Sequence, residues 1–288
     1  MVKTKIEFDL KWNGWDEYYN YWDGFVEHWY DSMLSGGAPK DIFTKSLRGD
    51  FSKRNEKTRL DVRELPEPYY GNGKDAKCAV VHLNPGASCD NEISKFFGRN
   101  GDLIASFEKE CGKKYSKYAK QWSSLNDSFE NYEASKVPGY DWWHNSNRLG
   151  FFSRFWEIKG LSEVFAIEAC PYHSKNWGMG MENVEKHIVE RVIVPALVIA
   201  NKNGNCAVFH GSKFKEIILK IKGVEEIGLW TSNRKYSLYK ICAPSALSRF
   251  KGVAYILVID AVTGMWFPKE TAENVEIENK IKELVKYS

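Results

Sequence analysis

The chain has 288 residues, of which 43% are hydrophobic and 27% charged, so it is long enough to bury a full core as one elaborated domain. No apolar run is long enough to cross a bilayer, and residues 1–10 carry charges where a signal peptide needs an apolar stretch. We therefore expect a soluble, cytoplasmic protein without a membrane partner. The net charge is only +3, so any nucleic-acid surface must be a local patch.

The six cysteines form no CxxC pair, and no cluster of His, Asp and Glu has metal-ligand spacing. These spacings argue against a zinc ribbon and against an iron–sulfur cluster. We expect reduced thiols, no metal and no cofactor.

Residues 1–64 are rich in aromatic side chains, and we expect them to form a mainly helical N-terminal extension packed on the main domain, residues 65–288. The aromatic residues recur at three- and four-residue spacings, which predicts a helix with one aromatic face: Trp12, Trp15, Tyr18, Tyr19, Trp22, Phe25 and Trp29. Two interpretations stay open. The face either packs on the rest of the chain or forms an exposed platform for stacking, and its exposure decides between them.

From Leu65 onward, apolar runs typical of buried strands alternate with amphipathic segments. The expected strands are Cys78–Leu83, Val164–Ala169, Cys206–His210, Tyr239–Cys242 and Val253–Ile259. The expected helices are Ile104–Lys120, Trp142–Ile158, Glu182–Ala200 with a kink or break at Pro195, and Lys213–Ile221. This alternation predicts an α/β fold, a three-layer α/β/α sandwich with a central, mostly parallel sheet.

Three segments begin with an apolar run and then break on Pro, Gly or Ser. They are Val80–Gly86, Ile167–Tyr172 and Ile241–Arg249. Each places polar groups where a strand runs into a loop. We expect these groups to gather at the carboxyl edge of the sheet, where open α/β sheets bind ligands.

In this order the three segments resemble the uracil-DNA glycosylase superfamily, over about Leu65–Arg249. Asn84-Pro85-Gly86 is similar to the family's Asn-Pro-Gly loop, which positions the attacking water. The second segment is similar to its base-reading strand, and Ala243-Pro244-Ser245 to the His-Pro-Ser or Asn-Pro-Ser loop that grips the flipped nucleotide. The resemblance implies a DNA partner and makes Asn84 and Glu168 the catalytic candidates.

The resemblance also implies further contacts with the substrate. Phe97 would stack on the flipped base, and Tyr172 and His173 would line the same cleft beside Glu168. The expected DNA-contacting residues are Ser88, Ser245, Leu247, Ser248 and Arg249, with Leu247 as the wedge that fills the space of the extruded base.

The chain departs from the family pattern at Ala243 and at Glu168. Ala243 lacks the side chain that would stabilise charge developing on the base. Glu168 stands where uracil-directed members commonly carry Asn, and a carboxyl group there favours the exocyclic amine of cytosine over the carbonyl of uracil. In a dry pocket its pKa would rise, and the protonated acid would donate to N3 of the base. The alternative is a structural Glu satisfied by backbone groups or by a nearby Arg or Lys.

The resemblance and Glu168 together predict a monomeric, monofunctional DNA glycosylase that excises a cytosine-derived base and leaves an abasic site. Removal of ordinary cytosine would destroy the cell's own genome, so we expect a substituent on C5, as in hypermodified phage DNA, and a role in antiviral defence. Other functions stay open. They are a catalytically weakened DNA-binding sensor of modified bases, a uracil or mismatch repair glycosylase, and a hydrolase of free nucleosides.

Overall fold

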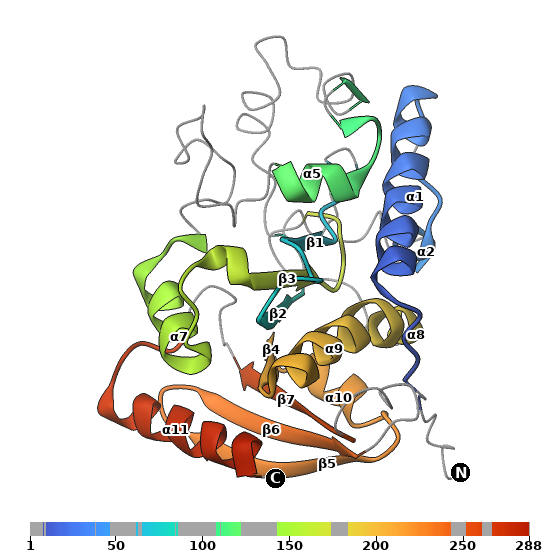
Figure 1. The fold of residues 1–288 in the computed structure, drawn as a ribbon. Helices are drawn as coiled ribbons and strands as arrows, with labels where there is room; N and C mark the ends of the chain where they lie inside the picture. Colours follow the sequence, from blue (N-terminus) through green and yellow to red (C-terminus); the bar gives the residue numbers. More distant parts are fainter. Residues whose placement is uncertain are drawn as a thin grey trace, which may run out of the picture.

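A computed structural model describes residues 8, 10–37, 39–46, 62, 65–83, 85, 108–109, 111–121, 143–173, 184–242, 252–260 and 267–287. In this part of the chain, seven strands form one sheet in the order β1-β3-β2-β4-β7-β6-β5 (Figure 1). The strands are β1 (Tyr69–Tyr70), β2 (Cys78–His82), β3 (Val164–Glu168), β4 (Cys206–His210), β5 (Val224–Thr231), β6 (Lys235–Cys242) and β7 (Val253–Asp260).

The sheet is parallel in its centre and antiparallel at both margins. Strands β3, β2, β4 and β7 pair in parallel, whereas β1 with β3, β7 with β6, and β6 with β5 pair antiparallel. The prediction of a mostly parallel sheet is therefore correct only for the four central strands. Strands β5 and β6 are joined by the short turn 232–234, and so short a connection permits only antiparallel neighbours.

The helices lie between and beside these strands. They are α1 (Trp15–Leu34), α2 (Ile42–Ser46), α5 (Tyr115–Gln121), α7 (Ser146–Trp156), α8 (Glu185–Ile188), α9 (Val194–Asn203), α10 (Phe214–Ile218) and α11 (Ala272–Tyr287). None of the helices in the described ranges is long and apolar enough to span a membrane.

The predicted break at Pro195 is a π-helical turn, Val189–Ile193, between α8 and α9. Proline has no N–H to donate to the carbonyl four residues back, so a regular α-helix cannot continue through this position, and the wider turn absorbs the missing bond. Of the helix expected at residues 104–120, the described residues form α5 after a left-handed turn at Gly112 and Lys113, with φ of 58° and 63°. Such a turn ends a helix.

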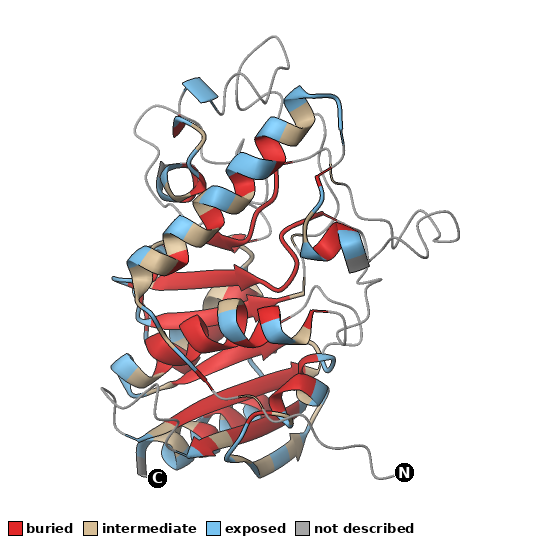
Figure 2. Cartoon of the chain, turned by 90° about the vertical axis from the view of Figure 1, so that its right-hand side faces the viewer, coloured by how far each residue is buried: buried red, intermediate tan, exposed pale blue. Residues whose placement is uncertain are grey.

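Two hydrophobic clusters cover the two faces of the sheet, because side chains alternate along each strand. Ala79 and Val81 of β2 join one cluster, with residues of α1, α9 and α10. Cys78 and Val80 join the other, with residues of α7 and α11. We call these the α9 face and the α7 face. Figure 2 shows the sheet as the most continuously buried part of the molecule.

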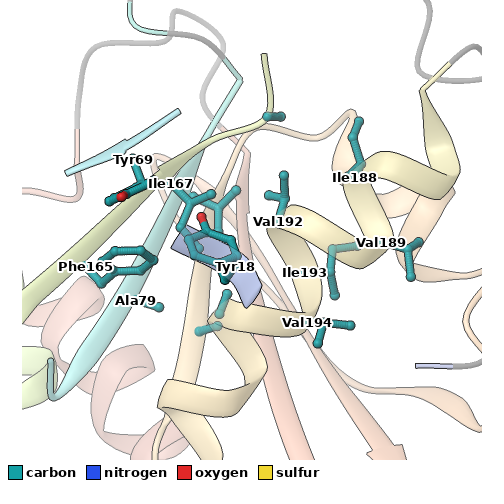
Figure 3. Packing of buried hydrophobic residues seen from close by; sticks show 14 of the residues in the cluster. Tyr18, Tyr69, Ala79, Phe165, Ile167, Ile188, Val189, Val192, Ile193 and Val194 are labelled. Carbon is teal, nitrogen blue, oxygen red and sulfur yellow. The ribbon is translucent and has the colours of Figure 1, made fainter. Parts of the chain in front are cut away.

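The aromatic residues of α1 pack into the α9 face. Trp22 and Trp29 are fully buried, and the ring of Tyr18 lies 5.5 Å from that of Tyr69 on β1 (Figure 3). The half-buried aromatic residues of the same segment pack against the same cluster. Burial therefore favours the packing interpretation over an exposed aromatic platform for these rings. Residues before and after position 64 share this one cluster.

Candidate functional site

Three titratable side chains end three adjacent parallel strands on the same face of the sheet. Glu168 is the last residue of β3, and it pairs with His82, the last residue of β2. The parallel pairing of Val81 with Phe209 leads on to His82 and His210, the last residue of β4, whose ring centroids are 5.5 Å apart. Because each residue follows one that belongs to the α9 face, all three point to the α7 face. We call Glu168, His82 and His210 the strand-end row.

The row lies at the point where the strand order reverses. The four parallel strands appear along the chain as β2, β3, β4 and β7 but lie in the order β3-β2-β4-β7. From β2 the chain moves first to one side and then to the other, so the crevice between the carboxyl ends of β2 and β4 is the topological switch point. Ligands of open α/β sheets bind there, and His82 and His210 flank it.

Glu168 is buried, with 3% of its surface exposed. Its backbone N–H donates to the carbonyl of Pro68 at 2.9 Å, which fixes the end of β3 against the segment that leads into β1. Within the described part of the chain, the side-chain atom Oε2 has no hydrogen-bond partner. Burial raises the pKa of this carboxyl group well above its ordinary value, and the negative charge of Glu67 raises it further. Both effects favour the protonated form of Glu168, which can both donate and accept a hydrogen bond.

The charged neighbour, Glu67, holds a second cluster of polar side chains. Its Oε2 lies 3.2 Å from Nε2 of His173, and its carboxylate accepts hydrogen bonds from the hydroxyls of Tyr70 at 2.8 Å and Tyr118 at 3.1 Å. Burial alone would raise the pKa of Glu67, but His173 and the two hydroxyls outweigh it and lower the pKa below the ordinary value. The pKa values of these two neighbouring carboxyl groups are thus shifted in opposite directions, a division typical of acid and base roles.

Aromatic rings and an arginine cover the row on the α7 face. Phe267, which precedes α11, stacks on His210 at 4.9 Å between centroids and 10° between planes. Trp143, before α7, lies 5.6 Å from His82. The guanidinium carbon of Arg148, in α7, lies 5.3 Å from the Phe267 ring centroid, and burial lowers the pKa of Arg148 to about 9. Burial, His210 and Arg148 also lower the pKa of His82 well below its ordinary value, so His82 is neutral.

The described strand of the first predicted segment, Val80–Gly86, borders this site. This strand is β2, and the carbonyl of Leu83 accepts a hydrogen bond from Cys170 N–H at 2.9 Å, so the exits of β2 and β3 are tied together. Asn84, Ser88 and Phe97 lie outside the described residues. Their predicted roles therefore stay predictions.

Of the residues predicted to line the base-binding cleft, the structure brings His173 together with Glu168 through Glu67. It places Tyr172 on the other face. Tyr172 is buried in the cluster of the α9 face, its ring packs against Phe25 and Phe43, and its hydroxyl donates to Asp41 at 2.6 Å. The prediction that Tyr172 contacts the base is therefore wrong in this arrangement, because the side chain is already committed to the core.

The third predicted segment does not share the edge with the first two. Its strand, β6, runs antiparallel to β7, and Cys242 at its end pairs with Val253 at the start of β7. The connection to β7 thus leaves and re-enters the sheet at the amino ends of the parallel strands.

Topology therefore corrects the expectation that all three segments meet at the carboxyl edge. Ser245, Leu247, Ser248 and Arg249 themselves lie outside the described residues. The apolar run that precedes them has no feature that distinguishes a parallel from an antiparallel strand. The sequence alone therefore could not reveal that β6 runs antiparallel to β7.

Sequence reasoning also missed part of the site. Arg148, Glu67 and Phe267 carry no local motif, because they reach the site from a helix and from loops. A signal was present for the two histidines: Cys-Ala-Val-Val-His in β2 and Cys-Ala-Val-Phe-His in β4 are nearly the same pentapeptide, each ending an apolar run on His.

The part of the chain that the structure describes contains no group of three or more His, Cys, Asp or Glu side chains placed to hold a metal ion. Comparison with protein families, with curated proteins and with solved structures found no match to this chain. The function therefore has to be inferred from the site.

Proposed function

We propose that this protein is a monofunctional DNA glycosylase that extrudes a cytosine-derived base carrying a C5 substituent and hydrolyses its N-glycosidic bond. The single observation that carries the proposal is the buried carboxyl group of Glu168 at the carboxyl end of a central parallel strand. Burial raises its pKa, and its Oε2 has no hydrogen-bond partner among the described residues. The proposal extends to a three-layer α/β/α domain of the uracil-DNA glycosylase type, acting in the cytoplasm as a monomer, with defence against phage DNA as its setting.

Glu168 would act on the Watson–Crick edge of the base. A protonated carboxyl group can donate to N3 of cytosine while its other oxygen accepts from the exocyclic amine. As the bond between the sugar and the base breaks, the proton moves to N3 and the base leaves neutral. The sugar develops oxocarbenium character and takes a hydroxyl group from water, whose remaining proton restores the Glu168 carboxyl group.

Asn84 would orient the attacking water. An amide can position water but cannot take its proton, which suits a transition state that is already largely dissociated. The motif that contains Asn84 follows directly on β2, whose last residue pairs with Glu168. The water and the acid would thus act from neighbouring strands.

A base-release assay tests the proposal. DNA containing cytosine, uracil, 5-hydroxymethylcytosine or its glucosylated form is incubated with the protein and then treated with mild alkali, which cuts abasic sites. We expect cuts only in the modified-cytosine DNA, and at least a hundredfold lower rate for Asn84→Ala. Glu168→Gln keeps the hydrogen bonds but cannot transfer a proton, so we expect a lower rate, altered base preference and a changed pH profile. Cuts in uracil DNA would contradict the role of Glu168.

A second candidate, a hydrolase of free nucleosides, gains support from the topology of β6. The loop expected to grip the phosphates beside the target base leaves the sheet at the opposite edge from Glu168, whereas a nucleoside needs no such grip. Binding to an oligonucleotide that weakens steeply with salt would favour the DNA enzyme. Release of base from 5-hydroxymethyldeoxycytidine but not from DNA would favour the hydrolase.

A further inference from the structure

The strand-end row has the dimensions of a small planar ligand. Neighbouring strands of a sheet lie about 4.8 Å apart, so the three side chains span about 10 Å across β3, β2 and β4. All three are nearly fully buried, with 3%, 5% and 4% of the surface of Glu168, His82 and His210 exposed. The distance between two neighbouring strands is comparable to the width of a pyrimidine ring. A base held by Glu168 at its amine edge would therefore extend toward His82.

The chemistry of the row suits a heterocycle better than an anion or a metal. An imidazole offers a hydrogen-bond donor and, in the neutral form that burial favours for His82, an acceptor as well. A protonated carboxyl group offers the same pair. Nitrogen heterocycles present donors and acceptors side by side in one plane. The ring of Phe267, parallel to that of His210, adds an aromatic plane at the same place.

We propose that Glu168, His82 and His210 form one recognition row for a planar nitrogen heterocycle, so that the two histidines contact the ligand alongside Glu168. The inference rests on the proposed function in taking the ligand to be the excised cytosine-type base. It adds two specificity-determining residues to which the family resemblance gives no role. It also places the base at the switch point between β2 and β4.

The alternative is a structural row whose polar atoms serve only the fold. The molecule contains a matched case, His187, which is buried on the α9 face. Its Nδ1 lies 3.3 Å from the Tyr21 hydroxyl, and its ring packs edge-on against Trp22 and Phe43. A structural histidine of this kind should not respond to a ligand at the sheet edge.

The test is a titration of the full-length protein with free cytosine and 5-hydroxymethylcytosine, followed through the imidazole nitrogen signals of its six histidines. We expect the signals of His82 and His210 to shift and that of His187 to stay. His82→Phe keeps an aromatic ring but removes the nitrogens, and we expect at least tenfold weaker binding. His187→Phe is the matched control and should bind as the wild type does.

The outcomes separate the two proposals. The recognition row is overturned if the base binds to saturation without shifting the signals of His82 and His210, or if the base does not bind at millimolar concentration. The titration of the wild-type protein decides this even if His82→Phe fails to fold. Base release from DNA that is unchanged in a folded His82→Phe variant also overturns the row and leaves the glycosylase standing. Binding through both histidines without base release from any DNA supports the row and removes the glycosylase.

Discussion

Glu168 and Tyr172 are four residues apart, both are buried at the exit of β3, and they lie on opposite faces of the sheet. Tyr172 points to the α9 face, where its hydroxyl donates to Asp41 at 2.6 Å. Glu168 points to the α7 face, where its Oε2 has no hydrogen-bond partner among the residues that the structure describes. Each face also buries a histidine among aromatic rings. His187 packs against Trp22 and Phe43 of α1 and α2, and His82 of the strand-end row packs against Trp143 and Phe267.

Burial alone therefore does not mark a functional residue in this protein. Burial lowers the pKa of both His82 and His187, the latter to about 3, and raises that of both Tyr172 and Glu168. The difference lies in position, since the row stands at the carboxyl ends of parallel strands and the α9 face is filled by the α1 helix. We infer that the α9 face carries stability and the α7 face, at this edge, carries chemistry.

The largest effect is expected from the structural face. Trp22 is fully buried and packs against Tyr18, Phe25 and His187, so Trp22→Ala should lower the free energy of unfolding by about 3–5 kcal/mol through lost burial and the cavity left behind. Chemical denaturation followed by tryptophan fluorescence and circular dichroism measures this loss.

The matched control is Glu27→Ala, at an exposed position of the same helix, which should change stability by less than about 0.5 kcal/mol. A Trp22→Ala variant as stable as the wild type would mean that α1 is not part of the core. The division between the two faces would then fail.

A second, smaller effect concerns the pH dependence of stability and tests the charge state of Glu168. Because its pKa is raised in the folded protein, the unfolded chain loses this proton first as pH rises. Stability then falls with rising pH from about 4.5, by up to about 1.4 kcal/mol for each pH unit, until the folded pKa is reached. Glu168→Gln removes this dependence, so its stability relative to the wild type should increase from pH 4 to pH 8.

The neighbouring carboxyl group provides the control of opposite sign. The pKa of Glu67 is lowered in the folded protein, so Glu67 stabilises the fold above the unfolded pKa and loses this contribution as pH falls through the folded one. Glu67→Gln should therefore be less stable than the wild type at pH 8 and approach it in acid. Parallel behaviour of the two variants would contradict the assignment of one protonated and one ionised carboxyl group.

Local patterns predicted the central strands well. The segments expected at Cys206–His210 and Val253–Ile259 form β4 and β7 within one residue, because a short apolar run bounded by turn residues is typical of a buried strand. At Pro195, where a kink or break was expected, the chain stays helical, and the irregularity is the π-helical turn Val189–Ile193 just before it, because the missing N–H acts within one turn. The carboxyl group of Glu168 could be read from the sequence as well, since it ends such a run.

Strand direction and the partners of side chains could not be read in this way. Both depend on contacts between segments far apart in the chain, such as Cys242 with Val253 on a neighbouring strand, or Tyr172 with Asp41 from the α2 segment. Strand β5 was not predicted at all, because its sequence lacks a regular alternation and its pairing with β6 carries a register shift between Glu226 and Gly228. Nothing local to Tyr172 distinguishes a core hydroxyl from one that contacts a ligand.

The smallest expected effect comes from Tyr172→Phe, which separates these two roles. The change removes only the hydroxyl group that donates to Asp41, and the ring keeps its contacts with Phe25 and Phe43. We expect a loss of about 1–2 kcal/mol of stability, the usual contribution of a hydrogen bond to a carboxylate. Base release should stay within twofold of the wild type, with the same preference among modified cytosines, whereas Glu168→Gln alters both. If Tyr172→Phe instead changed base preference at unchanged stability, the side chain would belong to the site, and the two faces of this edge would not divide structure from function.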